Sequence, residues 1–246
     1  MSRLIEAVLA RIIGIVMHRR ETLTREEEMA KRVFVAKLKK QARKTEDRFI
    51  IAMIGLIGSG KSTVAKELAK HIGATVVEGD AIRVELRQRG AKSYKRARAI
   101  AEDVALQLIE EGNNVILDSD FIDAKKRASL REKARKAGVR VHFLCTYADL
   151  DVTIGRIITA DYHKHAEDFF GGASTKWEGS EQSHGAVVKL REMFRRLPQH
   201  YRWINKIGGK WEIKNPPCRV IADIDTTNAT KWKVEVERVA KKSRFR

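Results

Sequence analysis

The sequence predicts an α/β domain in which a five-stranded parallel sheet lies between two layers of helices. Short, continuously apolar segments, each the length of one buried strand, alternate with segments whose apolar residues recur at helical spacing. Strands without apolar/polar alternation are typical of parallel sheets covered on both faces. In addition, a glycine-rich turn joins the first apolar segment, 48–54, to a helix over 62–72.

That turn reads Gly55-Leu56-Ile57-Gly58-Ser59-Gly60-Lys61-Ser62 and fits the phosphate-binding pattern G-x-x-x-x-G-K-[ST]. Glycines allow the backbone N–H groups to point inward, and the helix N-terminus adds partial positive charge. Lys61 is expected to reach the terminal phosphates of ATP, and the Ser62 hydroxyl to ligate Mg²⁺. The predicted nucleotide-binding residues are Gly55, Gly58, Ser59, Gly60, Lys61, Ser62 and Thr63.

Acidic residues stand where the later strands end. Further strands are expected over 74–80, 114–118, 139–147 and 219–225, with helices over 93–111, 123–137, 149–160 and 227–240 between and after them. Ligands of parallel sheets gather at the carboxyl ends of the strands. Asp80, Asp118 and Asp120 fall at that edge, so we expect them near Lys61.

The regions outside this core suggest a helical extension and a lid. Residues 4–16 have the spacing of an amphipathic helix, which could pack on its own domain, on a second subunit as a homodimer contact, or on a membrane surface. Thr24 and Glu27 predict a capping box that begins a second helix ending near Lys44. We therefore expect an N-terminal helical extension over 1–46 and the main domain over 47–246.

The second half of the chain carries the expected insertions. Residues from 161 to about 182 show no periodicity, and loops of this length are often lids, so the lid is placed at about 161–200. It includes a basic helix over 185–197 that Pro198 is expected to stop. Two short apolar stretches split by Gly208-Gly209 predict a hairpin insert at about 203–215. Its Trp203 and Trp211 could stack on nucleobases, but packing within the protein is favoured.

The charge of the chain indicates which partners the protein could bind, and its cysteine content indicates its cellular compartment. The net charge is +18; residues 1–48 carry 13 basic and 7 acidic side chains, and residues 189–246 carry 16 and 6. Basic flanks favour polyanionic partners, namely nucleic acid, an anionic membrane or a phosphorylated substrate; a solvated basic surface is the alternative explanation. Two cysteines make no disulfide framework, and no transmembrane or secretory segment is expected, so a cytoplasmic protein is predicted.

These motifs together resemble the P-loop kinases of the nucleoside-monophosphate-kinase fold. The phosphate loop, Glu78-Gly79-Asp80-Ala81-Ile82-Arg83 and Val115-Ile116-Leu117-Asp118 are similar to the polynucleotide 5′-kinase, zeta-toxin and adenylylsulfate-kinase group. The adenylylsulfate kinases, however, carry a substrate-binding signature after the fourth strand that this chain lacks. The resemblance covers about residues 48–160 and again the last strand and helix.

The resemblance also implies roles for individual residues. Asp80 corresponds to the base that orients and deprotonates the acceptor hydroxyl, and Arg83 to the group that holds the acceptor or the transferred phosphoryl group. Asp118 corresponds to the acid that binds Mg²⁺ through water, with Asp120 assisting. Arg156 corresponds to the arginine that neutralises transition-state charge; Arg191 or Arg195 could share that role.

The resulting hypothesis is an ATP-dependent kinase that phosphorylates a hydroxyl or phosphate on a small molecule or nucleotide. One alternative is a polynucleotide 5′-hydroxyl kinase, which would suit the basic flanks. Another is a P-loop ATPase that acts as a switch or nucleotide-binding adaptor. The chain lacks the Asn-Lys-x-Asp motif of GTPases and the Ser-Gly-Gly-Gln signature of transporters, which argues against the second alternative.

Overall fold

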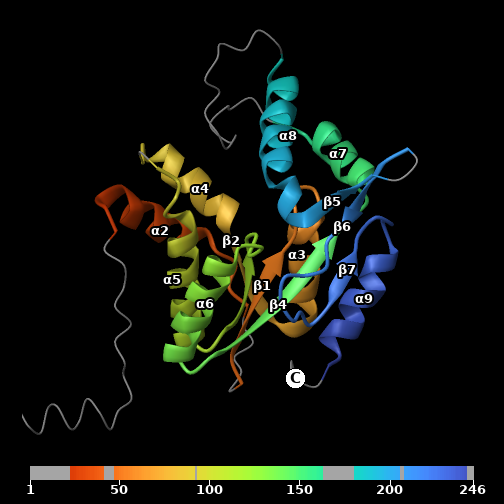
Figure 1. Ribbon diagram of the computed structural model, residues 1–246. Helices are drawn as coiled ribbons and strands as arrows, with labels where there is room; N and C mark the ends of the chain where they lie inside the picture. Colours follow the sequence, from red (N-terminus) through yellow and green to blue (C-terminus); the bar gives the residue numbers. More distant parts are fainter. Residues whose placement is uncertain (1–22, 42–46, 92, 163–179, 206–207, 243–246) are drawn as a thin grey trace, which may run out of the picture.

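A central sheet of five parallel strands organises the structure, a computed structural model that describes residues 23–41, 47–91, 93–162, 180–205 and 208–242 (Figure 1). The strand order is β2-β3-β1-β4-β7. The strands span β1 Phe49–Ile54, β2 Ala74–Glu78, β3 Asn114–Asp118, β4 Arg140–Tyr147 and β7 Asp223–Asp225. The predicted fold, a P-loop α/β domain with a five-stranded parallel sheet, is confirmed.

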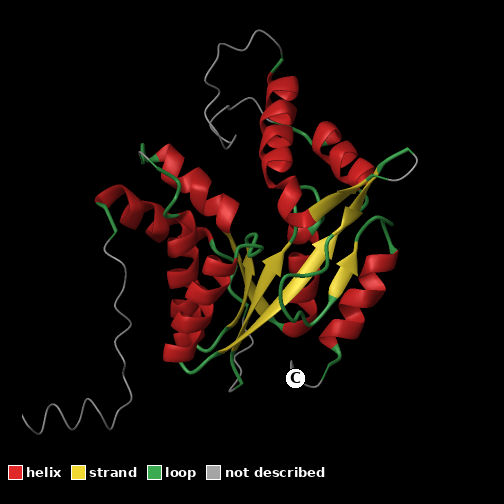
Figure 2. Cartoon of the chain, viewed as in Figure 1, coloured by secondary structure: helices red, strands yellow, loops and turns green. Residues whose placement is uncertain are grey.

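Helices cover both faces of this sheet (Figure 2). The described helices are α2 Arg25–Lys37, α3 Lys61–Ile72, α4 Gly79–Gln88, α5 Ala97–Glu110, α6 Ala124–Lys136, α7 Leu150–Thr159, α8 Glu181–His200 and α9 Lys231–Ala240. Helices α3 and α9 contact each other and one face, whereas α5 and α6 contact the other, with α2 packed on α4 and α5. The sheet is therefore the middle of three layers.

The central strand β1 contributes to both hydrophobic cores because its side chains alternate between the two faces. Ile50 and Ala52 belong to the core that includes α5 and the Ala30 and Phe34 side chains of α2. Ile51 belongs to the core that includes α3 and α9. Every residue of β1 is buried, which explains why the strand reads as a continuous apolar run.

Helices α7 and α8 and a small hairpin lie beyond the carboxyl edge of the sheet (Figure 1). The hairpin consists of β5 Tyr201–Ile204 and β6 Lys210–Ile213, which pair antiparallel as predicted. Leu56 at the start of the phosphate loop packs in one cluster with Ile157, Met193, Leu197 and Tyr201. This cluster fixes the two helices above the loop.

Several element ends differ from the sequence expectation. Helix α8 continues through Pro198 to His200, so the prediction that Pro198 stops it was wrong. Proline removes one backbone hydrogen bond, but the Tyr201 hydroxyl, which donates to the Ala148 carbonyl at 2.5 Å, holds the chain just beyond the helix. The regular part of the last strand is only Asp223–Asp225, although Ile221 N–H still donates to the Phe143 carbonyl of β4.

At the N-terminal side, the capping box predicted at Thr24 and Glu27 is present. The helix that it begins ends at Lys37 rather than near Lys44. The helix expected over 4–16 and most of the aperiodic lid segment lie outside the described residues. No described helix combines the length and apolar character that a bilayer crossing requires.

Candidate active site

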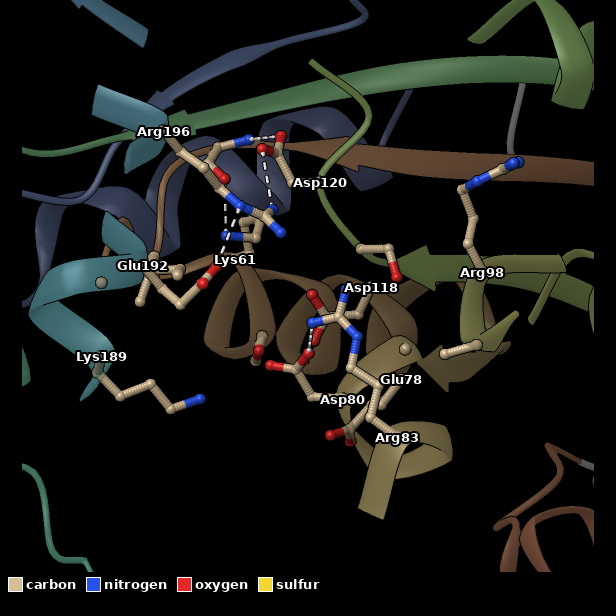
Figure 3. Close-up of a pocket in the computed structure, with 18 of the residues that line it drawn as sticks. Lys61, Glu78, Asp80, Arg83, Arg98, Asp118, Asp120, Lys189, Glu192 and Arg196 are labelled. Carbon is tan, nitrogen blue, oxygen red and sulfur yellow. Dashed lines mark hydrogen bonds and ion pairs between the residues drawn. The ribbon is translucent and has the colours of Figure 1, made fainter. Parts of the chain in front are cut away.

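A cavity of about 370 Å³ opens at the carboxyl edge of the sheet. The phosphate loop and the segments that follow β2 and β3 form one part of its wall, and α7 and α8 form another. In Figure 3, Lys61 lies near Asp120, while Asp80 and Arg83 lie together on a different part of the wall. The sequence-predicted residues therefore come together at one site.

The glycines of the loop are required by its shape. Gly58 has φ +83° and Gly60 has φ +79°, a region that residues with a side chain rarely adopt. A Cβ atom at Gly58 would also lie 2.8 Å from the Thr153 carbonyl oxygen, and one at Gly60 would lie 3.0 Å from Thr226 Oγ1. Gly60 is the N-cap of α3, so the loop delivers the chain into the N-terminus of that helix, as an anion site needs.

Lys61 lies against the loop that precedes it. Its ammonium group donates to the carbonyl oxygens of Gly55 at 2.7 Å and Leu56 at 2.8 Å. Ser59, by contrast, is buried, with its hydroxyl 3.0 Å from Thr146 Oγ1. The Ser59 side chain thus connects the loop to β4, whereas Lys61 lines the cavity.

The Asp118 carboxylate, at the end of β3, lies near the hydroxyl of Ser62 in the first turn of α3. Burial raises the pKa of Asp118, and the charges of Glu78 and Asp80 raise it further. The Ser62 hydroxyl and the charge of Lys61 act in the opposite direction. A buried carboxylate beside a hydroxyl is an oxygen donor set of the kind Mg²⁺ prefers, and a bound cation would relieve the cost of its charge. These residues fit the predicted magnesium site.

Asp120, the other predicted magnesium ligand, is already engaged by protein donors. Its Oδ1 accepts from the N–H groups of Gly55 and Ile122, each at 3.2 Å, and its Oδ2 lies 3.0 Å from Nε2 of His200. Burial favours the neutral acid, but the hydrogen bond and charge of His200, with smaller contributions from Lys61 and Gly55, lower the pKa of Asp120. Its metal role stays a prediction, and its evident contacts are with the loop and with α8.

Asp80 and Arg83 face the cavity from the first turn of α4. Arg83 Nη1 donates to Asp80 Oδ1 at 2.9 Å, and the Asp80 side chain is 64% exposed. The pair arises because α4 begins directly after β2, which puts residues three apart on one helix face at the carboxyl edge. An accessible carboxylate can accept a proton from a bound hydroxyl.

Arg156 contacts the phosphate loop directly. Its guanidinium donates to the Gly58 carbonyl at 3.2 Å and to Thr226 Oγ1 at 2.9 Å, and it lines the cavity. The two other arginines considered for the same role, Arg191 and Arg195, do not line it. Arg195 instead pairs with Glu192 at 2.6 Å and is largely exposed.

Some cavity residues were not identified as site residues from the sequence. They come from the end of β2 and from α5, α6 and α8, and are Glu78, Arg98, Lys126, Lys189, Glu192 and Arg196. The three helices bear many charged side chains, and only the packing of the helices decides which ones face the site. One signal was available: Lys189 and Arg196 lie seven residues apart, two helical turns, and therefore share a face.

A site built from His and Cys ligands, such as a zinc site, is not found in the described part of the chain. Among the residues that the structure describes, no group of three His, Cys, Asp or Glu side chains could hold a metal ion. His163 and His165 lie outside that part of the chain. The site described above depends instead on one carboxylate, one hydroxyl and a phosphate loop.

Comparisons with known proteins agree with this geometry. A protein-family model described as an AAA domain matches residues 50–166. An adenylyl-sulfate kinase from Myxococcus xanthus is 32% identical over 123 residues, which cover 47% of this chain and 66% of the kinase. A cytidylate kinase from Ignicoccus hospitalis is 25% identical over 162 residues, which cover 59% of this chain and 86% of that kinase.

Other matches are partial or concern the fold alone. Uncharacterized proteins from Mycobacterium species are 34% identical over 117 residues but are matched over only 23% of their length. The chain thus spans less than two thirds of the adenylyl-sulfate kinase and of the mycobacterial relatives. The crystal structure of APE1195 superposes with a TM-score of 0.54 at 18% identity, over 80% of this chain and 96% of that one. The phosphate loop, the match over residues 50–166 and the superposition agree with a P-loop α/β domain, and two of the relatives that this chain resembles are kinases.

Proposed function

We propose that this protein transfers the γ-phosphoryl group of ATP to a hydroxyl group of a small-molecule acceptor. One observation supports the proposal above the others: the phosphate loop with Lys61, the Asp118–Ser62 pair and the accessible Asp80 carboxylate all line one cavity. A nucleotide switch needs the first two but has no use for a proton acceptor beside the loop. The kinases among the relatives support the same reaction class.

Each of the proposed catalytic residues has a separate role in phosphoryl transfer. The acceptor oxygen attacks the γ-phosphorus, the bond from that phosphorus to the bridging β–γ oxygen breaks, and ADP leaves with the bond's electron pair. Asp80 accepts the hydroxyl proton. Lys61 and Arg156 offset the negative charge on the phosphoryl oxygens, and Arg83 orients the acceptor, since phosphoryl transfer depends mainly on alignment and charge neutralisation.

Ser62 and Asp118 would hold the magnesium ion. When bound, Mg²⁺ neutralises charge on the β- and γ-phosphates. The protein itself contributes a buried carboxylate, Asp118, at the end of β3. Beside it lies the hydroxyl of Ser62, in the first turn of α3.

A labelled-phosphate transfer screen tests the proposal. The purified protein is incubated with γ-labelled ATP and Mg²⁺ and with sugars, sugar phosphates, nucleosides, nucleoside monophosphates and oligonucleotides with free 5′ ends. We expect label in a small-molecule class, with turnover lost in Lys61→Met and reduced by at least about 100-fold in Asp80→Asn. Asp151→Asn, a carboxylate change at an exposed position of α7, serves as the control.

Other outcomes decide against the proposal. Label in the oligonucleotides alone would indicate the polynucleotide kinase alternative. ATP hydrolysis at the same rate with and without every acceptor, unchanged in Asp80→Asn, would indicate a switch or adaptor.

A further inference from the structure

The cavity has more positive side chains than ATP binding requires. Beyond Lys61 and Arg156, which contact the phosphate loop, five cationic side chains from four helices line it: Arg83, Arg98, Lys126, Lys189 and Arg196. Whether any of them forms a ligand site depends on which lack an internal partner, since a partly buried charge without good hydrogen bonds is costly.

Two of the arginines are neutralised by neighbouring acids. Arg83 pairs with Asp80 at 2.9 Å. Arg98 is hydrogen bonded to Glu102, whose carboxylate is fully buried and also accepts from Lys133 at 2.7 Å. Burial lowers the pKa of Lys189, on α8, although the charges of Asp80 and Glu192 act in the opposite direction. Arg83 and Arg98 therefore need no external anion.

Arg196 is different. Its side chain is only 21% exposed, yet the guanidinium donates no hydrogen bond that the structure records among the described residues. The nearest carboxylate oxygens are those of Asp120, 3.8 Å from Nη1, and Glu192, 3.9 Å from Nε. Asp120 cannot easily turn toward it, because its two oxygens already accept from Gly55, Ile122 and His200. A planar group with five donors is left facing the cavity.

The ammonium group of Lys126 lies near the same aspartate. The one hydrogen bond recorded for this side chain among the described residues is a long one, 3.4 Å from Nζ to the Asp120 carbonyl oxygen. Burial lowers the pKa of Lys126, and the charge of Arg196 lowers it further, while the charges of Asp120 and Asp123 act in the opposite direction. Two cations that repel each other, of which Arg196 has only two long ion pairs with carboxylates in the described part of the chain, thus border the cavity.

We propose that Lys126 and Arg196 form a binding subsite for a dianionic phosphate group carried by the acceptor, away from the hydroxyl that reacts. Two cations match two negative charges, and the fork of Arg196 suits phosphate oxygens. The phosphates of ATP have separate donors in Lys61 and the loop. The assignment of this phosphate group to the acceptor rests on the proposed function. The anion subsite itself can be tested independently of that function.

The test uses inorganic phosphate as the probe. A non-hydrolysable ATP analogue with Mg²⁺ is first titrated into the full chain by calorimetry, to fill the phosphate loop. The unfolding temperature of the filled protein is then measured in 0 to 50 mM phosphate, in acetate and in chloride at matched ionic strength. The variants are Lys126→Gln, Arg196→Gln and the double variant, and the matched control is Lys125→Gln/Arg135→Gln, which removes two exposed charges from α6.

Phosphate binding stabilises the folded state by mass action, so we expect the unfolding temperature of the wild type and the control to rise with phosphate but not with acetate. Each single substitution should weaken the phosphate affinity by about 10-fold, and the double variant should lose the response. Affinity for the ATP analogue should stay within about twofold of wild type in every variant.

A phosphate response in the double variant equal to that of the control would overturn the proposal, as would an equal response to acetate. Loss of analogue affinity in Lys126→Gln or Arg196→Gln would also overturn it, because these residues would then serve ATP. If the wild type fails to bind the analogue, the proposed function falls. The subsite is then tested by the same phosphate series in a Lys61→Ala background, which weakens the phosphate loop.

Discussion

The His200 imidazole and the Asp120 carboxylate are hydrogen bonded within the protein, with 3.0 Å between Nε2 and Oδ2. His200 is the last residue of α8, and its side chain is only 7% exposed. The other oxygen of Asp120 accepts from the N–H of Gly55, the first residue of the phosphate loop. A short chain of contacts therefore connects the end of α8 to the loop, and α8 also supplies Lys189 and Arg196 to the cavity.

Removing the imidazole should loosen the loop. In His200→Ala, Asp120 loses its closest side-chain donor, and we expect affinity for a non-hydrolysable ATP analogue to fall by about 10-fold, the effect of one hydrogen bond to a charged group. His200→Gln, which keeps a donor, should recover part of it. His71→Ala on the more exposed part of α3 is the control. Equal affinities in His200→Ala and wild type, measured by calorimetry, would contradict the coupling.

Asp118→Asn should increase stability while removing activity. Burial raises the pKa of this carboxyl, so between its ordinary and its raised pKa the folded state holds a proton that the unfolded state has lost. Stability therefore falls as pH rises through that window, and at neutral pH the ionised carboxylate destabilises the fold. The amide lacks this charge, and we expect the unfolding temperature at pH 7 to rise by a few degrees.

The same substitution should abolish the effect of Mg²⁺ on nucleotide affinity, because Asp118 is a proposed ligand. At a pH below the ordinary range for aspartate, the stability difference between Asp118→Asn and wild type should shrink, since both side chains are then neutral. A variant that is less stable than wild type at pH 7 by thermal unfolding would disprove this account of Asp118.

Alanine substitutions at Gly58 and Gly90 distinguish the cost of backbone strain from the cost of steric crowding. Both have positive φ, +83° and +68°, so an alanine at either position costs about 1–2 kcal/mol in conformation alone. Nothing lies within 4 Å of a Cβ at Gly90, whereas a Cβ at Gly58 would meet backbone of α7 at 2.8 Å. Gly58→Ala should therefore be the more destabilising change in urea unfolding and should also weaken ATP binding, while Gly90→Ala should keep wild-type affinity. Equal losses of stability would mean that crowding at the loop has no cost.

The sequence was sufficient for the elements that local rules determine. Continuous apolar runs located the strands, and the capping box at Thr24 was correct because its hydrogen bonds form within four residues. The loop glycines and the acids after β2 and β3 were also placed correctly at one edge, since parallel strands bring their carboxyl ends together.

Tertiary contacts decided what the sequence could not. Pro198 normally ends a helix, but contacts of the residues beyond it keep α8 helical to His200. Asp120 was expected to assist Asp118 in binding Mg²⁺, yet one of its oxygens is hydrogen bonded to a histidine 80 residues away. Likewise, Arg196 rather than Arg195 faces the cavity, because the rotation of α8 is set by the burial of Met193 and Leu197.

Arg156 should contribute to both stability and catalysis, because it lines the cavity and its guanidinium donates to the Gly58 carbonyl and to Thr226. Arg156→Gln removes the charge and the forked geometry, and we expect a loss of about 1–3 kcal/mol in the free energy of unfolding. If Arg156 also offsets charge in the transition state, kcat should fall by more than 100-fold while KM for ATP changes less.

Arg156→Lys keeps the charge but not the bidentate geometry, so it should restore part of kcat and little of the stability. Arg202→Gln, on the exposed hairpin, is the control for charge loss. A stability loss with an unchanged kcat in Arg156→Gln would assign Arg156 to holding the loop alone. An unchanged stability would show that its contacts with Gly58 and Thr226 contribute nothing to the fold.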